Sequence, residues 1–322
     1  MAGSDIVQQG DSVILYFSIT NLVLVPGIKP EGTTHNSAGY FLHSDIIGKA
    51  FGDKVEPHHK SETPRSLYIL RVTPELFTLS IPHRTQIIYH ADISAIMMGL
   101  NILPGSTVAE AGTGSASLSF SFAYSLAPSG KLYTFEVDSV RAQQNRELLE
   151  HVTPKGVVTL EERDVIQQGF PPELSVDAVF LDLPSPWLAV GNARRILKPN
   201  GKLCTFSPSI EQVTKNTSAM RSEGFHEIKT VEVMLKPWGL DLPKQIGEKR
   251  KRSSKGQSFQ LPMRGHTSYL TFAIRQLDDE AQYPKPILSL AKVTRMASSR
   301  AKTEQEAVKE ENKDILPVSL EM

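Results

Sequence analysis

Three features that assign many proteins to a class are scarce or absent in this sequence. Cys204 is the single cysteine among 322 residues, so an internal disulfide cannot form and a reducing compartment is expected. No stretch reaches the roughly 18 apolar residues of a transmembrane helix, and residues 1–5 lack the basic and apolar segments of a signal peptide. We therefore expect a soluble, intracellular protein with no membrane partner.

A net charge is also lacking, because 35 basic residues balance 35 acidic ones. Composition by itself therefore names no partner. The length suffices for one or two domains with a sizeable core. Residues 276–322 are charged and low in aromatic side chains, and we expect them to form a disordered tail.

The N-terminal part of the chain reads as a small β domain over residues 1–80. Residues 12–24 are rich in β-branched and aromatic side chains and carry no helix caps. Residues 68–72 and 77–81 have the same character. Between these runs, residues 32–43 are expected to form a loop of glycine, threonine and histidine that contacts a substrate or a partner.

From Gln86 onward the apolar residues follow a helical period. One helical face is predicted to carry Ile87, Ile88, Ile93, Ile96, Met97 and Leu100. Strands and helices then alternate, with helices expected at about residues 115–127, 139–150, 189–196 and 210–223. Such alternation indicates βαβ units with a parallel sheet covered on both faces. Residues 229–235 and 268–274 are expected as the last strands, on either side of a basic, polar insertion at 243–260.

Four acidic residues each end, or directly follow, a short apolar run. They are Glu110, Glu136, Asp164 and Asp182. In a parallel sheet the strand ends share one edge, which forms the ligand crevice. Four carboxylates at that edge suit a cation that carries a sugar and an exocyclic amine, such as S-adenosylmethionine.

A glycine loop follows the first of these carboxylates. Gly112 and Gly114 let the backbone approach a ligand and turn into the next helix. Glu136, 22 residues past Gly114, matches the spacing of a dinucleotide-binding dehydrogenase as well. Two features favour the methyl donor instead: Ser117 replaces the third glycine, and Glu110 precedes the loop. Glu136 is then expected to bind the ribose hydroxyls and Asp164 the adenine amine, unless they are only solvated strand-end carboxylates.

Asp182 begins a segment with two prolines. Pro184 and Pro186 fix φ and remove amide donors, so a stiff, extended loop is expected here rather than a helix start. Trp187 at its end is expected to hold an acceptor base beside Asp182, or alternatively to pack beneath the loop.

Residues 82–89, 110–117 and 182–187 together resemble the catalytic subunit of tRNA adenine-N1-methyltransferase, which modifies position 58 in the T-loop. The similarity extends from about residue 10 to residue 275. It implies an α/β fold with a Rossmann-like class I methyltransferase domain, here residues 81–275, after the N-terminal β domain. It further implies S-adenosylmethionine as donor, tRNA as substrate, and a paralogous non-catalytic tRNA-binding subunit in a heterotetramer.

The resemblance also assigns residues. Asp182 matches the catalytic aspartate. The donor-binding positions are Gln86, Tyr89, Glu110, Gly112, Thr113, Gly114, Ser115, Ser117, Glu136, Arg141, Asp164, Val165 and Asp182. Ala116 is a departure, because the family usually has glycine there. Its methyl group is harmless only if φ is negative and the ligand does not touch its Cα. No metal is expected, because the nine histidines show no ligand spacing.

The expected chemistry follows from the acceptor. Adenine N1 is a weak nucleophile on the Watson–Crick edge, so the base must leave its stack to react. Asp182 would accept a hydrogen bond from the exocyclic amine and stabilise the charge that develops. The alternatives are a non-catalytic RNA-binding paralogue, which should have lost the glycine loop or Asp182, and a methyltransferase for another substrate. The basic run at 249–252 is read as a tRNA phosphate contact, a nuclear import signal or a solvated loop, and we expect a nuclear protein.

Overall fold

A computed structural model describes residues 5–36, 39–58, 66–82, 85–236, 238–239, 259–260 and 265–276. The basic run at 249–252 and the tail from residue 277 lie outside these ranges, so the expectations for them stay predictions. No helix in the described ranges is long and apolar enough to cross a membrane.

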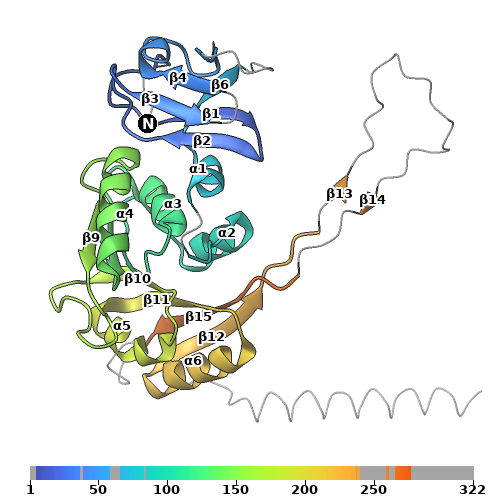
Figure 1. The fold of residues 1–322 in the computed structure, drawn as a ribbon. Coiled ribbons are helices and arrows are strands. Elements are labelled where there is room, and N and C mark those ends of the chain that lie inside the picture. Colours follow the sequence, from blue (N-terminus) through green and yellow to red (C-terminus); the bar gives the residue numbers. More distant parts are fainter. Residues whose placement is uncertain are drawn as a thin grey trace, which may run out of the picture. The chain divides into compact units, whose positions relative to one another are not determined.

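The N-terminal β domain is built on a four-stranded antiparallel sheet with strand order β2-β1-β6-β5 (Figure 1). Its strands are β1 (Val13–Ser18), β2 (Asn21–Val25), β5 (Lys54–Val55) and β6 (Leu67–Arg71). Buried Val13, Leu15 and Ile69 form its core together with Phe41 and Ile46 from the following segments. The β runs at 12–24 and 68–72 are therefore confirmed as strands.

Two segments of this region differ from expectation. Residues 32–43 are not a plain loop, because β3 (Thr33–Asn36) pairs with β4 (Gly39–Leu42), and Phe41 anchors the pair in the core. A short 3₁₀ turn, η1 (His43–Asp45), follows β4. Alternating exposed and half-buried side chains along β3 are typical of a surface hairpin.

Residues 77–81, expected as a strand, belong to helix α1 (Pro74–Ser80), so that prediction was wrong. Thr73 caps the helix by accepting the amide of Leu76 at 3.4 Å, and Pro74 occupies the first helical position. This threonine-proline start is a strong helix signal that outweighs the β propensity of the residues after it. The buried Phe77 ring stacks on Phe120 with centroids 4.3 Å apart.

The second domain, which follows the N-terminal β domain, contains a seven-stranded sheet of order β12-β15-β11-β10-β7-β8-β9. Pairing is parallel from β11 through β9, whereas β15 is antiparallel to both of its neighbours. The strands are β7 (Thr107–Ala111), β8 (Lys131–Glu136), β9 (Val158–Glu162), β10 (Val176–Leu181), β11 (Leu197–Ser207), β12 (Phe225–Glu232) and β15 (Tyr269–Arg275). Because β7 pairs in parallel with both β10 and β8, the carboxyl ends of these three strands lie at one edge of the sheet. This is the arrangement predicted from the acidic residues that follow the apolar runs.

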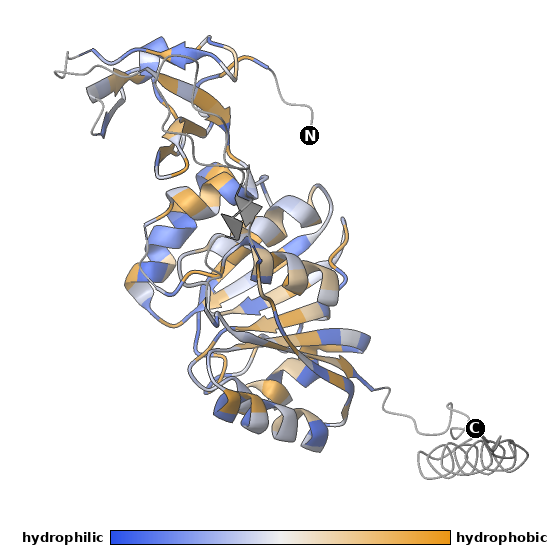
Figure 2. Ribbon diagram, turned by 90° about the vertical axis from the view of Figure 1, so that its right-hand side faces the viewer, coloured by the Kyte–Doolittle hydropathy of each residue, from blue (hydrophilic) through white to orange (hydrophobic). Residues whose placement is uncertain are grey.

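Helices cover both faces of this sheet. They are α2 (His90–Gly99), α3 (Ser117–Leu126), α4 (Ser139–Val152), α5 (Val190–Ile196) and α6 (Ile210–Ser222). One apolar cluster joins α2 and α3 to the sheet, and a second joins α5 and α6. In Figure 2 the central strands are largely orange, whereas the helices carry both blue and orange residues. Strands buried on both faces are typical of a parallel α/β sheet.

The C-terminal strands match their predicted places only approximately. β12 begins at Phe225 and ends at Glu232, a few residues before the predicted 229–235. The backbone of β13 (Trp238–Gly239) pairs with β14 (Phe259–Gln260), so the last two residues of the predicted insertion form a strand.

Candidate active site

A cavity of about 1000 Å³ opens at the carboxyl ends of the parallel strands. Of the predicted site residues, it is lined by Gln86, Gly112, Gly114, Glu136, Arg141, Asp164, Val165 and Asp182. A smaller cavity of about 20 Å³ shares Gly112, Gly114 and Asp182 with it and adds Glu110, Thr113, Ser115 and Ser117. Tyr89 lines neither; it precedes α2 and packs with Phe77 and Ile81. The structure therefore brings together every predicted site residue except Tyr89.

The glycine loop between β7 and α3 requires glycine for two reasons. Gly112 has φ +93°, and a Cβ there would lie 2.0 Å from the backbone oxygen of Asp182. Gly114 has φ +55°, and a Cβ would lie 2.9 Å from the Thr85 hydroxyl. The loop thus approaches the end of β10 so closely that no side chain fits at residue 112.

Ala116 does not meet the first condition for a harmless methyl group. Its φ is +65° with ψ 14°, in the left-handed region, directly before α3. An L-residue other than glycine is strained there by about 1–2 kcal/mol. The second condition is met with respect to the cavities, because Ala116 is fully buried and is not among their lining residues. The departure from glycine therefore affects the backbone, and its methyl group does not face the ligand space.

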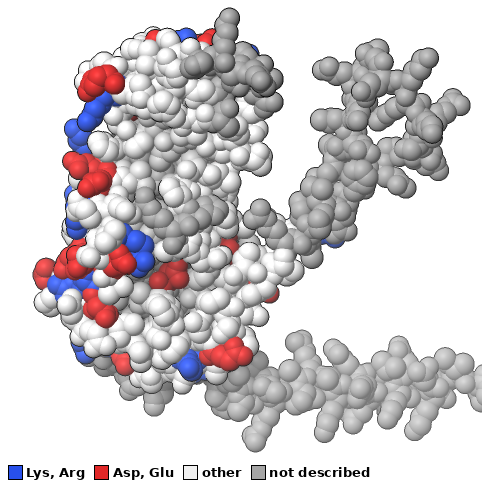
Figure 3. All heavy atoms as spheres, in the orientation of Figure 1, with Lys and Arg blue, Asp and Glu red and all other residues white. Residues whose placement is uncertain are grey.

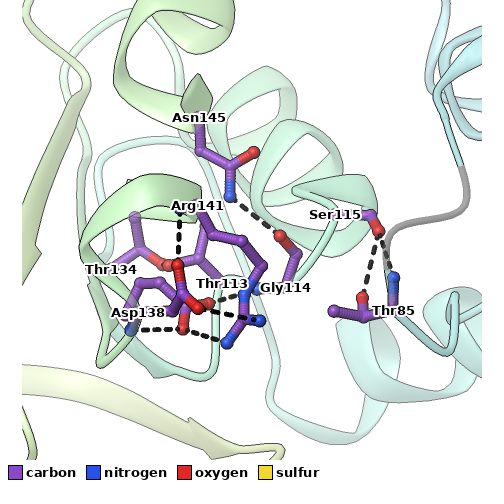
Figure 4. Close-up of polar contacts among 9 residues, drawn as sticks. Thr85, Thr113, Gly114, Ser115, Thr134, Asp138, Arg141 and Asn145 are labelled. Atoms are coloured by element: carbon purple, nitrogen blue, oxygen red, sulfur yellow. Dashed lines mark hydrogen bonds and ion pairs between the residues drawn. The ribbon is translucent and has the colours of Figure 1, made fainter. Parts of the chain in front are cut away.

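Glu136, at the end of β8, accepts hydrogen bonds from Gly114, Asp138 and Arg141, the three donors labelled in Figure 4. Its Oε1 accepts the amide of Asp138 at 3.0 Å and the Arg141 guanidinium at 2.9 Å. Its Oε2 accepts the amide of Gly114 at 3.0 Å. The carboxylate is buried, and its hydrogen bond raises the pKa of Arg141 further above its ordinary value. Because Oε2 accepts only one of these bonds, it has the greater capacity left for a ligand hydroxyl.

Asn145 supports the same loop and was not predicted. Its Nδ2 donates to the Gly114 carbonyl at 2.8 Å from a fully buried position on α4 (Figure 4). Arg141 lies one helical turn earlier on α4, so both residues face the loop. The sequence offered one signal for this role of Asn145: it is a polar residue one turn after Arg141 on the same face of the predicted helix.

Glu110 lies inside β7 in a polar chain of hydroxyl groups. Its Oε2 accepts Ser119 Oγ at 2.6 Å and Thr134 Oγ1 at 2.7 Å, and Thr134 in turn contacts Thr113 Oγ1 at 2.7 Å. Burial raises the pKa of Glu110 to about 8. A cation that enters the small cavity beside Glu110 would favour the ionised carboxylate and so lower the pKa of this group.

Asp164 and Val165 form a braced turn after β9. Asp164 Oδ1 accepts the amides of Ile166 at 2.9 Å and Gln167 at 3.2 Å. The Val165 carbonyl accepts Asn192 Nδ2 at 2.7 Å, which ties the turn to α5. The Asp164 carboxylate is therefore held at the cavity wall with a fixed orientation.

Asp182 follows β10 and lines both cavities. Its amide donates to the Ala111 carbonyl at 2.9 Å, which joins the ends of β10 and β7. Burial and, secondly, the charge of Glu136 raise the pKa of Asp182 to about 7. A carboxyl group that titrates near neutral pH in a cavity is suited to exchange protons or hydrogen bonds with a substrate.

The segment after Asp182 differs from expectation at its end. Pro186–Leu188 forms a 3₁₀ turn, η2, because proline is tolerated at the first position of a helical turn. The Trp187 ring lies under the Lys215 ammonium of α6, 4.5 Å from its centroid, and Trp187 does not line the cavity. The expected position of Trp187 at the acceptor base is therefore not seen in the cavity lining, and its ring contacts α6 instead. Leu183, Pro184, Ser185 and Leu188 line the cavity in its place.

Three carboxylates, those of Glu136, Asp164 and Asp182, line the large cavity. Within the described ranges, no group of three or more His, Cys, Asp or Glu side chains is placed to hold a metal ion. Instead, the carboxylates follow the strand ends in the order predicted from the sequence.

Known proteins share both the sequence and the fold. The family described as tRNA methyltransferase complex GCD14 subunit matches residues 65–245. The catalytic subunit of tRNA (adenine(58)-N(1))-methyltransferase from Cryptococcus neoformans is 41% identical over 241 residues, which are 74% of this chain and 54% of the relative. The Schizosaccharomyces pombe subunit of the same name is 39% identical over 239 residues, 72% of this chain and 65% of the relative. This chain therefore spans about half the length of the first of these relatives.

Two solved structures have the same fold. An S-adenosylmethionine-dependent O-methyltransferase from Thermotoga maritima aligns with TM-score 0.68 and 25% identity, covering 86% of this chain and 97% of its own. The tRNA (m1A58) methyltransferase TrmI from Aquifex aeolicus aligns with TM-score 0.62 and 22% identity, covering 84% of this chain and 99% of its own. The predicted Rossmann-like domain with an N-terminal β domain is thereby confirmed. With the matches in sequence, these findings establish that the chain belongs to the tRNA methyltransferase complex GCD14 subunit family.

Proposed function

We propose that this chain transfers a methyl group from S-adenosylmethionine to N1 of the adenosine at position 58 of tRNA. We further propose that it acts as the catalytic subunit of a nuclear heterotetramer with a paralogous, non-catalytic tRNA-binding subunit. The observation that carries the activity is the intact set of Asp182, Glu136 and the glycine loop around one cavity, in a chain of this family. A non-catalytic paralogue would be expected to lack part of that set.

The donor side of the cavity fits S-adenosylmethionine. Glu136 Oε2 retains capacity for a ribose hydroxyl, Asp164 faces the cavity from the turn after β9, and Glu110 offers a buried carboxyl for an ammonium group. When bound, the donor supplies an electrophilic methyl group on a sulfonium that leaves as a neutral thioether. The protein's main tasks are thus to align the acceptor and to exclude water.

Asp182 carries the acceptor chemistry in this proposal. Its carboxylate accepts a hydrogen bond from the exocyclic amine of adenine, and this bond strengthens as positive charge develops on the ring. Such electrostatic stabilisation by a fixed group is commonly worth two to three orders of magnitude in rate. Burial beside the glycine loop keeps the group poorly hydrated, which increases the interaction.

The proposed partner and tRNA are supported by charge as well as by family. The chain has no net charge, and on the face shown in Figure 3 basic and acidic side chains lie interspersed. A tRNA-binding enzyme needs basic surface to neutralise phosphates, so a second subunit is expected to supply part of it. The matching family is described as a subunit of a tRNA methyltransferase complex.

Mass spectrometry of nucleosides tests the activity directly. We expect N1-methyladenosine in tRNA incubated with the chain, its co-expressed paralogous subunit and the donor. A transcript with guanosine at position 58 is the matched control and should stay unmodified. Methylation of the control transcript, or transfer only to proteins or small molecules, would contradict the proposed substrate.

Glu136→Ala should weaken donor binding in calorimetry, and unchanged affinity would move the donor site elsewhere.

A further inference from the structure

One wall of the two cavities comes from the segment that connects α1 to α2. Thr85 and Gln86 line both cavities, and Ile87 and Ile88 line the smaller one. Residues 85–89 belong to no helix or strand. Because neither a helix nor a sheet supplies a ladder of backbone hydrogen bonds here, side-chain contacts must hold this wall against the glycine loop.

Two serines, just before and at the start of α3, hold the two ends of this segment. At one end, the Thr85 amide donates to Ser115 Oγ at 3.3 Å, and the two hydroxyl oxygens lie 3.0 Å apart (Figure 4). At the other end, Ser117 Oγ donates to the Ile88 carbonyl at 3.0 Å. The hydroxyl proton of Ser117 therefore serves this wall rather than a bound ligand.

Thr78 on α1 extends this contact beyond the site. Its Oγ1 lies 2.9 Å from Ser117 Oγ, and both side chains are buried. A hydroxyl carries one proton, so Ser117, which donates to the Ile88 carbonyl, accepts from Thr78. The result is a directed chain from the Thr78 hydroxyl through Ser117 to the Ile88 carbonyl. Thr78 itself lines neither cavity.

The opposite direction of this chain satisfies fewer acceptors. Thr78 Oγ1 also lies 2.9 Å from the Pro74 carbonyl, so in that direction Ser117 donates to Thr78 and Thr78 to Pro74. The Pro74 carbonyl, however, lies four residues before Thr78 in α1 and accepts the helical amide there. The Ile88 carbonyl would lose the bond from Ser117, and a buried carbonyl without a partner is costly. The direction toward Ile88 is therefore favoured.

Packing holds α1 firmly enough to serve as the anchor of this chain. Phe77, next to Thr78, is fully buried and stacks on Phe120 of α3. The same apolar cluster includes Ile87 of the cavity wall and, partly buried, Leu24 of β2 in the N-terminal β domain. Thr78 thus contacts the wall from a helix that packs on both domains.

We propose that Thr78 is a positioning residue for the methyl donor, acting through Ser117 on the carbonyl of Ile88. This inference rests on the proposed function, since it assumes that S-adenosylmethionine fills the cavities. Without the Thr78 proton, Ser117 loses the partner that orients its hydroxyl, so the Ile88 end of the wall relaxes away from the glycine loop in the free protein. Binding of the methyl donor must then restore the wall, which weakens affinity and leaves the groups around Asp182 unchanged.

Thr78→Val tests this in the full complex, because valine has the shape of threonine and lacks the hydroxyl proton. We expect the Kd for S-adenosylmethionine in calorimetry, and the KM for it in kinetics, to rise about fivefold, the effect of one net hydrogen bond. The kcat at saturating methyl donor should stay at the wild-type value. Thr78→Ser keeps the hydroxyl and should retain the wild-type affinity.

Thr271→Val is the matched control. Thr271 is also fully buried, and its hydroxyl lies 3.0 Å from Thr230 Oγ1 between β15 and β12, outside the cavity lining. We expect this variant to lower the melting temperature about as much as Thr78→Val does and to keep the wild-type Kd for the methyl donor. If Thr78→Val also keeps that Kd while its melting temperature falls, the hydroxyl is merely structural and the proposal is overturned.

A double-mutant cycle with Ser117→Ala tests the route itself. If Thr78 acts only through Ser117, adding Thr78→Val to Ser117→Ala should leave the Kd at the value of Ser117→Ala alone. Effects that multiply would show that Thr78 acts by another route, which also overturns the proposal. This calorimetry contains no tRNA, so its outcome is distinct from failure of the proposed function, which would show as absent N1-methyladenosine with the wild-type complex.

Discussion

Two carboxyl groups of the cavity have pKa values close to neutral, for the same physical reason. Burial raises the pKa of Asp182 to about 7 and that of Glu110 to about 8. Both values lie above those of an unfolded chain, so the folded protein binds more protons between about pH 4 and pH 8. The contribution of these groups to folding stability is therefore fully present at low pH and is lost as the pH rises through 7 to 8.

The same ionisation predicts the pH dependence of catalysis. Asp182 must be ionised to accept a hydrogen bond from the adenine amine, so kcat/KM for tRNA should rise with pH and level off above about 7. Asp182→Ala should lower the single-turnover rate by about two orders of magnitude and remove this limb, while donor affinity changes much less. Near-normal turnover in the variant would make Asp182 a structural loop residue.

Ala116 offers a prediction about stability. Ala116→Gly relieves the left-handed strain of about 1–2 kcal/mol but gives the unfolded chain about 0.4–1 kcal/mol of extra entropy. We expect a net gain of about 1 kcal/mol in the free energy of unfolding, measured by denaturant titration. The control is Ala123→Gly inside α3, which should destabilise the protein by a similar amount. A loss of stability in Ala116→Gly would mean that its methyl contacts outweigh the strain.

At the scale of elements, the approach of the glycine loop to the end of β10 defines the site. Gly112→Ala should push the loop away from the Asp182 backbone, where a Cβ would lie 2.0 Å from the carbonyl oxygen. We expect donor affinity to fall at least tenfold in calorimetry. Gly105→Ala is the matched control, because it has a similar φ of +89° but only a 3.2 Å contact with the Ser129 hydroxyl. It should lose stability and keep its donor affinity, which separates the collision from the strain.

The elements also show why part of the fold was predictable. Strands β7, β8, β9 and β10 each end near an acidic residue, and the ends of parallel strands converge, so Glu136 and Asp182 could be placed together from local patterns alone. The threonine-proline start of α1 was a local signal for a helix, and in the structure it outweighs the β propensity of the residues after it. No local pattern could place Trp187 on Lys215, because that contact joins a turn to a helix that follows β11. Asn145 had one local signal, its place one helical turn from Arg141, but its acceptor, the Gly114 carbonyl 31 residues away, could not be read from that pattern.

At the scale of the whole molecule, the lack of net charge suggests that this chain binds the donor and that a partner subunit supplies part of the tRNA-binding surface. Every predicted site residue belongs to this chain, but the chain as a whole has no excess of positive charge for a tRNA. The chain alone is therefore expected to bind the donor with the affinity of the complex and to bind tRNA much more weakly. Calorimetry with each ligand, on the chain and on the complex, checks this division. Equal tRNA affinity of both would contradict the need for a partner.

The C-terminal end of the chain is expected to be dispensable for methylation. The residues that form the site all precede residue 277, and the sequence predicts disorder beyond it, so deleting 277–322 should leave tRNA methylation by the complex near wild type. Deleting 267–322 is the contrasting variant, because it also removes β15, which pairs with β11 and β12 in the sheet. That loss strips two strand ladders and uncovers the apolar face beneath them, so the protein should not fold. Circular dichroism and nucleoside mass spectrometry on both variants decide the matter: unfolding of the shorter deletion would show that the tail packs on the domain.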